Sequence, residues 1–415
     1  AGGTDMKPDT MRKIDATLGP PICALLSLRR KILDRFWPRR FGSLADAPIG
    51  KILMVKPAEM GSTVLMYAML ERAREIWPQC EFHFLVFAEN TAAVDMLGLV
   101  PKANIHTIRT ANLFIFAWDA LHRLVSLNLA EFDLVFDLEF FSRASAILAE
   151  LAGASSSCGF NRFSMEGLYK GSFFTHPVQY NPHIHTAQTF LSMVDAVIQP
   201  DGQVPLNKTA TMPLDELKLA TLNTSPEEQK QVREQLYHEA PACPRENRLV
   251  IINANSSELV PLRRWPLENF IELGRRLLEK PEISIVLTGT MSERPESERV
   301  SAALGNSRVI NMVGKTTLRQ LLVLYSVCDL MITNDSGPSH FASLTDLPVI
   351  TLFGPETPRL YGALGKNKVA ISAELACSPC VSSYNHRATA CNDNACMRAI
   401  SVDDVFITCL DLLRP

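Results

Sequence analysis

The chain has 415 residues, of which 47% are hydrophobic and 20% are charged. These fractions are close to the average of globular proteins, so they exclude a disordered tail, a collagen-like fibre or a coiled coil as the main body. The 41 lysines and arginines nearly balance the 44 aspartates and glutamates, and the net charge is -3. This balance excludes a molecule-wide positive field that would attract nucleic acid.

The length predicts two or three domains, at roughly 150 residues per domain. No stretch of the sequence approaches the roughly 18 consecutive apolar residues that a membrane-spanning helix needs. The opening residues lack the basic segment and long apolar run of a secretory signal. Most of the 10 cysteines are scattered singly, which is typical of reduced intracellular proteins. We therefore expect a cytoplasmic protein.

Residues 1–50 form an amphipathic and basic N-terminal segment. The apolar run "GPPICALLSL" is followed by "RRKILDRFWPRR", in which basic residues outnumber one acid, Asp34. Such a segment is typical of a helix lying on a membrane surface, which would place the protein at the inner face of the cell membrane. It is equally typical of an additional helix that packs on the first domain and leaves a basic edge in solvent. The sequence leaves both interpretations open.

Residues 51–200 alternate two kinds of pattern. The runs "KILMVK", "EFHFLVF" and "FDLVFDL" indicate strands, and stretches such as "TVLMYAMLERAREIW" between them indicate helices. Segment 201–247 is polar and punctuated by prolines, which predicts a linker. A second series of strands and helices fills residues 248–400, and a last helix occupies 401–415. Such series predict parallel sheets covered by helices, so we expect an α/β fold with two Rossmann-like domains.

One segment of the second series predicts a ligand site. In open parallel sheets, ligands bind at the carboxyl ends of the strands. The segment "TNDSGPSH", residues 333–340, follows the expected strand "DLMI" and places Pro338 at the expected first position of a helix. Backbone N–H groups at such a helix start have no partner within the helix, so they could bind a phosphate. The alternative is an ordinary capped helix.

This part of the chain resembles a known family. Residues 334–365 closely resemble the nucleotide-sugar-binding signature of glycosyltransferase family 9, the heptosyltransferase-like enzymes, and read "NDSGPSHFASLTDLPVITLFGPETPRLYGALG". The segment "RRWP" at 263–266 resembles the family's motif of a basic residue, Trp and Pro. "CSPC" and the later "CMRAI" resemble its C-terminal region. The resemblance covers roughly residues 51–413.

The resemblance implies a GT-B type fold, in which two Rossmann-like α/β domains face a central cleft. The domain at 51–200 would bind the acceptor, and the domain at 248–400 would bind the nucleotide sugar. It also implies an inverting, metal-independent glycosyltransferase. Such an enzyme moves heptose or a related sugar from a nucleoside-diphosphate donor to a lipopolysaccharide, lipid-linked or other surface-glycan acceptor, and it requires no cofactor for catalysis.

The donor-binding residues follow from this resemblance. A leaving nucleoside diphosphate gains negative charge, which preorganised N–H groups and cations can stabilise in place of a metal ion. One arginine of "RRWP" takes the place where the family often has Lys, although the pair taken alone reads as a solvated basic pair. Glu293 stands on the nucleoside side, where it would accept from ribose hydroxyls or simply be an acid in the first turn of a helix. The expected donor-binding residues are Arg263, Arg264, Glu293, Asn334, Asp335, Ser336, Gly337 and His340.

Four residues of the first series are expected to bind the acceptor. "FDLEFFSR" places Glu139 and Arg143 after a strand, and Arg143 could meet an acceptor phosphate. "NPHIHTAQTF" places His183 and His185 two apart, which puts both on one side of an extended chain. The alternatives are an acid that caps the following helix and histidines that pack within a loop.

The catalytic base is where the sequence departs from its family. The family pattern has Gly-Asp after the first strand, and that Asp is the accepted candidate for removing the acceptor proton. Here the loop reads "KPAEMGSTVL", so Ser62 stands in the place of the Asp. A serine hydroxyl is a far weaker base than a carboxylate near neutral pH. We therefore expect Glu59 to be the general base and Ser62 to cap a helix that begins at about Thr63.

Four clustered cysteines have the spacing C-x2-C-x10-C-x4-C: Cys377, Cys380, Cys391 and Cys396. This pattern suggests a structural zinc site, with disulfides or reduced thiols as the alternatives.

Two other functions of the protein stay open at this point. The departure at Ser62 would fit a catalytically silent nucleotide-sugar-binding protein. A non-hydrolysing nucleotide-sugar epimerase is less favoured, because "NDSGPSH" and "RRWP" match the transferase family.

Overall fold

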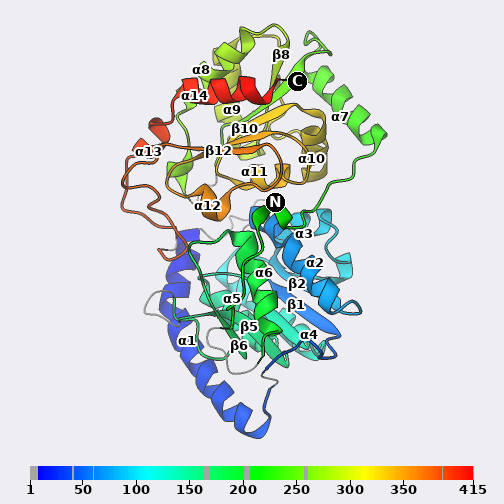
Figure 1. Ribbon diagram of the computed structural model, residues 1–415, viewed down its shortest axis with the longest axis vertical. Helices are drawn as coiled ribbons and strands as arrows, with labels where there is room; N and C mark the ends of the chain where they lie inside the picture. Colours follow the sequence, from blue (N-terminus) through cyan, green and yellow to red (C-terminus); the bar gives the residue numbers. More distant parts are fainter. Residues whose placement is uncertain are drawn as a thin grey trace. The chain divides into compact units, whose positions relative to one another are not determined.

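The computed structural model describes residues 8–39, 42–58, 60–162, 168–200, 206–256, 260–385 and 387–414. The chain divides into two compact units, Ala1–Lys218 and Leu219–Pro415. Each unit holds one six-stranded parallel sheet with helices packed on it (Figure 1). The predicted α/β fold with two Rossmann-like domains is confirmed. The division between the units lies within the segment predicted as a linker, 201–247.

The sheet of unit 1 has the strand order β3-β2-β1-β4-β5-β6, and neighbouring strands are parallel. The order reverses between β1 and β4, which marks the point where ligands bind in doubly wound sheets. The strands are β1 (Lys51–Val55), β2 (Glu81–Phe87), β3 (Ile105–Ile108), β4 (Leu134–Asp137), β5 (Ser156–Asn161) and β6 (His176–Gln179). The helices are α1 (Pro8–Phe36), η1 (Met60–Met66), α2 (Tyr67–Ile76), η2 (Ala88–Asn90), α3 (Thr91–Met96), η3 (Lys102–Asn104), α4 (Leu113–Leu129), α5 (Arg143–Leu151), α6 (Thr186–Val197) and η4 (Leu214–Glu216).

The sheet of unit 2 repeats this topology, with the order β12-β11-β10-β7-β8-β9. Its reversal falls between β7 and β10. The strands are β7 (Arg248–Asn253), β8 (Ile283–Leu287), β9 (Val309–Asn311), β10 (Leu330–Asn334), β11 (Val349–Phe353) and β12 (Lys368–Ser372). The helices are α7 (Pro226–Glu239), η5 (Pro261–Arg263), α8 (Leu267–Leu278), η6 (Met291–Glu293), α9 (Arg294–Leu304), α10 (Leu318–Val327), α11 (Gly337–Ala342), α12 (Pro358–Tyr361), α13 (Ala395–Arg398) and α14 (Val402–Leu412).

Helix α7 lies in the segment that the sequence predicts as a linker. Its start carries a full capping box, in which the Ser225 hydroxyl accepts from the Glu228 N–H and the Glu228 carboxylate accepts from the Ser225 N–H. Pro226 stands at the first helical position, where its missing N–H costs nothing. The motif Ser-Pro-x-Glu is itself a helix signal, so this helix could have been predicted. It packs on α10 within unit 2.

Helix α1 packs on unit 1 along α5. Its inner side buries Cys23 and Leu26 in the same core cluster as residues of α4 and α5. Gly19 allows the close approach, since a Cβ there would lie 2.5 Å from the Cδ of Arg143. The structure thus confirms that this segment forms a helix packed on the first domain. None of the described helices is long and apolar enough to cross a membrane.

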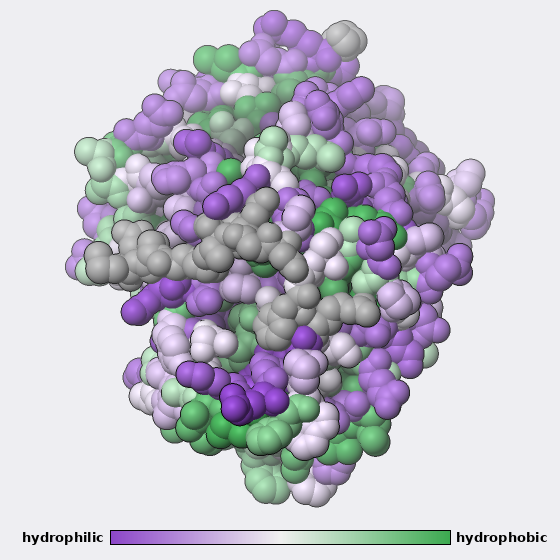
Figure 2. Space-filling view, turned by 60° about the horizontal axis from the view of Figure 1, so that its bottom comes forward, coloured by the Kyte–Doolittle hydropathy of each residue, from purple (hydrophilic) through white to green (hydrophobic). Residues whose placement is uncertain are grey.

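The solvent side of α1 is nevertheless not simply polar. Figure 2 brings forward the end of unit 1 at which α1 terminates, and hydrophobic side chains gather there beside strongly hydrophilic ones. Several large apolar residues of α1 and α4 are exposed, among them Leu25, Phe36, Phe114 and Leu129. Their arrangement is taken up below.

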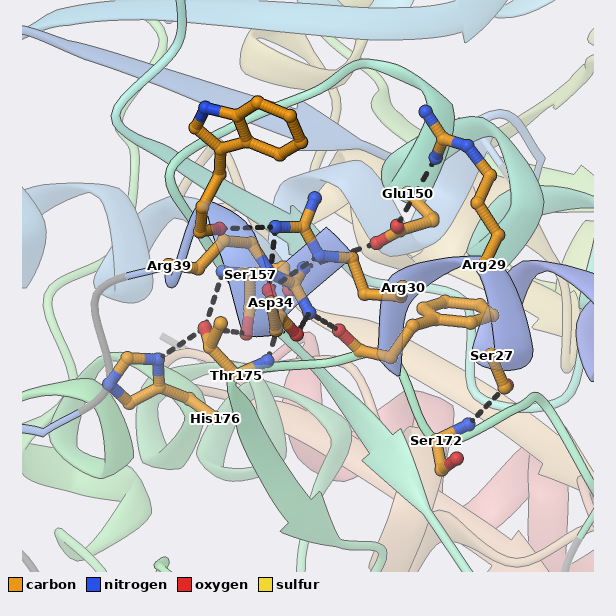
Figure 3. A network of polar contacts seen from close by, with 12 residues as sticks. Ser27, Arg29, Arg30, Asp34, Arg39, Glu150, Ser157, Ser172, Thr175 and His176 are labelled. Atoms are coloured by element: carbon orange, nitrogen blue, oxygen red, sulfur yellow. Dashed lines mark hydrogen bonds and ion pairs between the residues drawn. The ribbon is translucent and has the colours of Figure 1, made fainter. Parts of the chain in front are cut away.

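A polar network holds the end of α1 to unit 1 (Figure 3). The Arg39 guanidinium lies 3.2 Å from the buried Glu150 carboxylate of α5 and 3.3 Å from Asp34, and it donates to the Phe173 carbonyl. Ser27 of α1 accepts from the Ser172 N–H. Burial is the main influence on the central pair, and it raises the pKa of Glu150 and lowers the pKa of Arg39. The charged forms of Arg39 and Glu150 therefore stabilise each other in this buried position.

We expect Arg39→Ala to destabilise unit 1 by about 3–5 kcal/mol, because it leaves the buried Glu150 carboxylate without its main cation. Urea unfolding followed by circular dichroism measures this loss. Arg398→Ala is the matched control, since Arg398 forms an exposed ion pair with Asp393 and its removal should change stability little. Equal effects of the two substitutions would contradict the structural role given to Arg39.

Candidate functional site

The point where the strand order of unit 2 reverses is organised by Asn334, the last residue of β10. Its side-chain oxygen accepts from the Trp265 N–H at 2.9 Å, and its amide nitrogen donates to the Ala254 carbonyl at 2.8 Å. Asn334 therefore ties the segment after β7 to the end of β10. The Trp265 ring is fully buried behind it, with its N–H bonded to the Ile400 carbonyl.

The contacts of Asn334 with Trp265 and Ala254, called the Asn334 clamp below, position a buried cluster of charges. Arg263 reaches the Glu356 carboxylate at 2.8 Å and lies 3.6 Å from the Asp335 carboxylate. It also donates to the Asp335 carbonyl at 3.3 Å. A second guanidinium, that of Arg387, lies 3.4 Å from the other oxygen of Glu356. Two cations and two carboxylates thus meet at the carboxyl ends of β10 and β11. Three of these side chains are buried, and that of Arg387 is partly exposed.

Asp335 is the most strongly perturbed member of the cluster. Burial raises its pKa from 3.8 to about 7; the Arg263 guanidinium opposes this shift, and the neighbouring Glu356 carboxylate adds to it. A protonated Asp335 leaves the two guanidiniums opposite one carboxylate, so the cluster then carries a net positive charge. Such a cluster suits an anionic ligand.

In the turn after Asp335, the space beside the backbone of Gly337 is not filled by other side chains. Ser336 precedes α11 in extended conformation, and its hydroxyl donates to the Asn334 carbonyl instead of capping the helix. A Cβ built on Gly337 would meet nothing closer than 3.9 Å. His340 is buried one turn further along α11. The structure therefore brings Arg263, Asp335, Ser336, Gly337 and His340 together, as the sequence predicts.

Unit 1 has a corresponding pair of ion pairs where its strand order reverses. Glu139, which follows β4, accepts at 2.9 Å from both the Lys56 ammonium and the Ala58 N–H. Asp137 at the end of β4 lies 2.5 Å from the Lys170 ammonium, and both side chains are fully buried. Glu139 thus fixes the course of the loop after β1. Glu59, the expected general base, belongs to this loop and lies outside the described residues.

Comparison with known proteins identifies the family. A model described as glycosyltransferase family 9 (heptosyltransferase) matches residues 123–389, more than half of the chain. The chain belongs to glycosyltransferase family 9. Lipopolysaccharide heptosyltransferase 1 of Pseudomonas aeruginosa is 25% identical over 341 residues, which cover 80% of this chain and 86% of that protein. The resemblance seen in the sequence is confirmed, and the chain is a glycosyltransferase.

Solved structures show the same fold. The E. coli ADP-heptose lipopolysaccharide heptosyltransferase II has a TM-score of 0.66 at 19% identity, over 88% of this chain and 98% of that one. The E. coli heptosyltransferase WaaC with ADP has a TM-score of 0.62 at 16% identity, over 87% of this chain and 99% of that one. The predicted GT-B type of fold is confirmed.

Within this family 9 fold, Asn334, Glu293 and Arg264 have partners inside the protein and lie outside the buried cluster of charges. Asn334 is used by the clamp described above. The Glu293 carboxylate accepts from the Thr290 N–H at 2.6 Å in a capping box, which is the helix-start alternative. Arg264 points to the Ser256 carbonyl at 3.3 Å and to Glu296 at 3.6 Å, whereas Arg263 joins the buried cluster. Of the two arginines of the "RRWP" motif, only Arg263 therefore lies in the cluster with Asp335 and Glu356.

The expected acceptor-binding residues are largely dispersed. Arg143 is buried against α1, bonded to the Tyr169 carbonyl at 2.9 Å and paired with Asp15 at 3.4 Å. His185 is buried and caps α6 by accepting from the Ala187 N–H, while His183 is exposed in a turn. The expectation that both histidines share one side of an extended chain is wrong, because the chain turns between them.

The helix expected to begin at about Thr63 does not begin there. Ser62 lies inside the 3-10 helix η1, and α2 begins only after Met66. The prediction that Ser62 caps this helix is therefore wrong, because the tighter turn starts two residues before it.

Two functional candidates were missed by sequence reasoning, Glu356 and Arg387. Glu356 lies three residues after the end of β11, so its place near a strand end was the available signal.

The cysteine cluster is partly buried. All four thiols, Cys377, Cys380, Cys391 and Cys396, are free, and Cys396 is buried near Gly354. Burial raises the pKa of Cys396, and the neighbouring Cys380 and Cys377 add to the rise. Over the described residues, which exclude residue 386, no three His, Cys, Asp or Glu side chains are arranged to hold a metal ion. The structural zinc stays a prediction that metal analysis of the purified protein can test.

The raised pKa of Asp335 predicts how stability varies with pH. The neutral carboxyl is the form that the fold favours, so this contribution is complete below about pH 4 and is lost as the pH rises to about 7. We expect Asp335→Asn, which cannot ionise, to gain stability relative to the native chain over that interval and to keep the gain at higher pH. Each unit of the upward shift corresponds to about 1.4 kcal/mol.

Urea unfolding at several pH values measures this trend. Asp335→Asn also loses the contact with Arg263, and this loss changes the free energy of unfolding by a constant amount that does not vary with pH. Asp403→Asn, at an exposed acid, is the control and should show no such trend. A difference between Asp335→Asn and the native chain that is the same at every pH would show that the fold does not raise the pKa of Asp335.

Proposed function

We propose that this chain transfers heptose, or a closely related sugar, from an ADP-linked donor to the core of lipopolysaccharide or a similar lipid-linked glycan, in the cytoplasm. The observation that carries the proposal is the buried cluster of Arg263, Asp335 and Glu356 beside the open backbone at Gly337, in a member of glycosyltransferase family 9. The names of its relatives support the donor and the acceptor, since they include a lipopolysaccharide heptosyltransferase and an ADP-heptose enzyme.

The donor would lie against the carboxyl ends of β10 and β11. In the proposed reaction the acceptor oxygen attacks the anomeric carbon as the bond from that carbon to the diphosphate oxygen breaks, with inversion. The electron pair leaves with the diphosphate, where Arg263, His340 and the N–H groups after Asp335 would stabilise the added charge. Because these groups can supply that stabilisation, the proposed transfer needs no metal ion.

The acceptor proton must go to a base, and we keep Glu59 in this role. The loop that carries it is held by Glu139, which accepts from Lys56 and from the Ala58 N–H. Because Glu139 already has these two partners, it is better suited to positioning the loop than to removing a proton itself. Ser62 lies three residues further on and has no carboxylate to offer.

The activity is tested with purified protein, ADP-heptose and a lipopolysaccharide core acceptor that lacks the heptose. We expect release of ADP that depends on the acceptor, proceeds with EDTA present, and yields a product of inverted anomeric configuration by NMR. Donor binding without any release of ADP, across a panel of acceptors, would support the silent-binder alternative instead.

We expect Gly337→Val to weaken ADP binding by at least tenfold, because its side chain occupies the space where the diphosphate approaches the backbone. The fold should survive, since a Cβ at Gly337 meets nothing within 3.9 Å. Gly337→Ala should show an intermediate loss. Isothermal titration calorimetry measures affinity and thermal unfolding checks the fold. Unchanged affinity in both variants would remove this turn from the site.

We expect Glu59→Gln to lower turnover by about 10²- to 10⁴-fold, the usual worth of a general base, with donor affinity nearly unchanged. Glu131→Gln is the matched control, because Glu131 is exposed and precedes β4. It therefore lies at the amino ends of the strands, whereas Glu59 follows the carboxyl end of β1. Single-turnover kinetics separate the chemical step from binding. Full activity of Glu59→Gln would move the role to Glu139 or His183.

A further inference from the structure

Helix α1 carries a row of apolar residues on its solvent side. Leu18, Ile22, Leu25, Ile32 and Phe36 are between 39% and 66% exposed. Their spacing follows the turns of the helix, so they lie along one side of it. The helix already buries a different side, with Cys23 and Leu26, in the core of unit 1. The exposed row is therefore not needed for packing within the chain.

Helix α4 has a second row of the same kind. Phe114, Trp118, Leu121, Val125 and Leu129 recur every three or four residues and are between 54% and 78% exposed. This helix also buries another side, through Ala120 and Leu127, in the core cluster that α1 joins. Both helices pack on α5, so they belong to one layer of unit 1. Exposed apolar surface of this extent marks an interaction site.

The charges beside the first row all have the same sign. Arg29, Lys31 and Arg35 are exposed on the C-terminal half of α1, and Arg29 also lies 3.9 Å from the Glu150 carboxylate. Asp34, the single acid of residues 16–38, is paired with Arg30 at 2.6 Å and with Arg39 at 3.3 Å. The outer side of this half of the helix is therefore apolar and cationic. Trp37 and Trp118 are also exposed, and tryptophan favours the boundary between lipid and water.

We propose that the outer sides of α1 and α4 form a docking surface for an anionic lipid bilayer, named here the α1/α4 surface. Apolar side chains that enter the lipid boundary, flanked by cations that meet anionic headgroups, are the features of helices that lie in a membrane interface. A second copy of the chain fits less well, because it would offer the same cationic surface and not the anionic groups that these cations would pair with.

The bilayer would meet α1 while the helix stays attached to unit 1. The contacts of Ser27 with Ser172, and of Arg39 just after the helix with Glu150, hold the helix to unit 1 and leave its exposed apolar row uncovered. Unit 1 would therefore lie on the membrane in a fixed orientation. This use rests on the proposed function, in which the acceptor is lipid-linked, but the test below involves no sugar transfer.

The test is flotation of the full-length protein with vesicles of phosphatidylcholine alone or mixed with phosphatidylglycerol. We expect binding to the mixed vesicles and its loss at high salt, because salt screens the cations. Each basic residue near an anionic bilayer strengthens binding about fivefold. The variant with Arg29, Lys31 and Arg35 changed to Ser should thus bind on the order of 100-fold more weakly.

Two paired variants test the apolar rows. Leu25→Glu with Ile32→Glu, and Phe114→Glu with Leu121→Glu, should each weaken binding at least tenfold, with unchanged circular dichroism because all four residues are exposed. Met291→Glu with Ile407→Glu is the matched control, since both residues are exposed apolar side chains of unit 2. This control should bind like the native chain.

Two outcomes would overturn the proposal. One is an absence of vesicle binding by a protein that is folded and transfers sugar to a water-soluble acceptor fragment, which would leave the proposed function intact. The other is a stable dimer in analytical ultracentrifugation that Leu25→Glu with Ile32→Glu converts to monomers, which would assign the α1/α4 surface to a second copy. Vesicle binding without sugar transfer would instead contradict only the proposed function.

Discussion

A guanidinium held between two carboxylates organises the carboxyl end of the sheet in unit 2. Charges removed from water are tolerated only when they are paired and bonded, so Arg263, Asp335 and Glu356 must stay together for the fold to hold them. The clamp at Asn334 brings the segment of Arg263 to the end of β10, and the Trp265 ring fills the space behind it. The same pairing keeps the cationic groups beside the backbone of Gly337, at the carboxyl ends of the strands. These groups are already in place to stabilise the diphosphate of the proposed donor.

Much of the fold follows from local patterns. Strand β11 and the second half of β2, from Phe84 to Phe87, are mostly apolar runs buried on both faces, and parallel sheets covered by helices require such runs. The strands without a sequence signal are short or polar, such as β3 and β6, which reads His-Pro-Val-Gln. They lie at the sheet edges, and pairing with a formed neighbour makes them strands, which local propensity does not reveal.

The candidate site was predictable to the extent that it follows a strand end. Asp335, Gly337 and His340 lie within one short segment, so the motif places them together. Glu356 and Arg387 join them only through tertiary contacts across the ends of different strands. Some predicted site residues also have partners inside the protein. Asn334 at the end of β10, and His185 and Glu293 at helix starts, bond to nearby backbone N–H groups, as polar groups in a folded chain commonly do.

The position of α1 in the chain has a consequence for synthesis. The partners of this helix come much later, since Asp15 accepts from the N–H groups of Arg143 and Ala144, and Arg39 reaches Glu150 and Phe173. At about 5–20 residues per second, a ribosome needs on the order of ten seconds to make the intervening chain. During that interval the inner side of α1 lacks its protein partners, and its apolar surface is open to chaperones. The helix therefore reaches its native contacts only after residues 143–173 have been made.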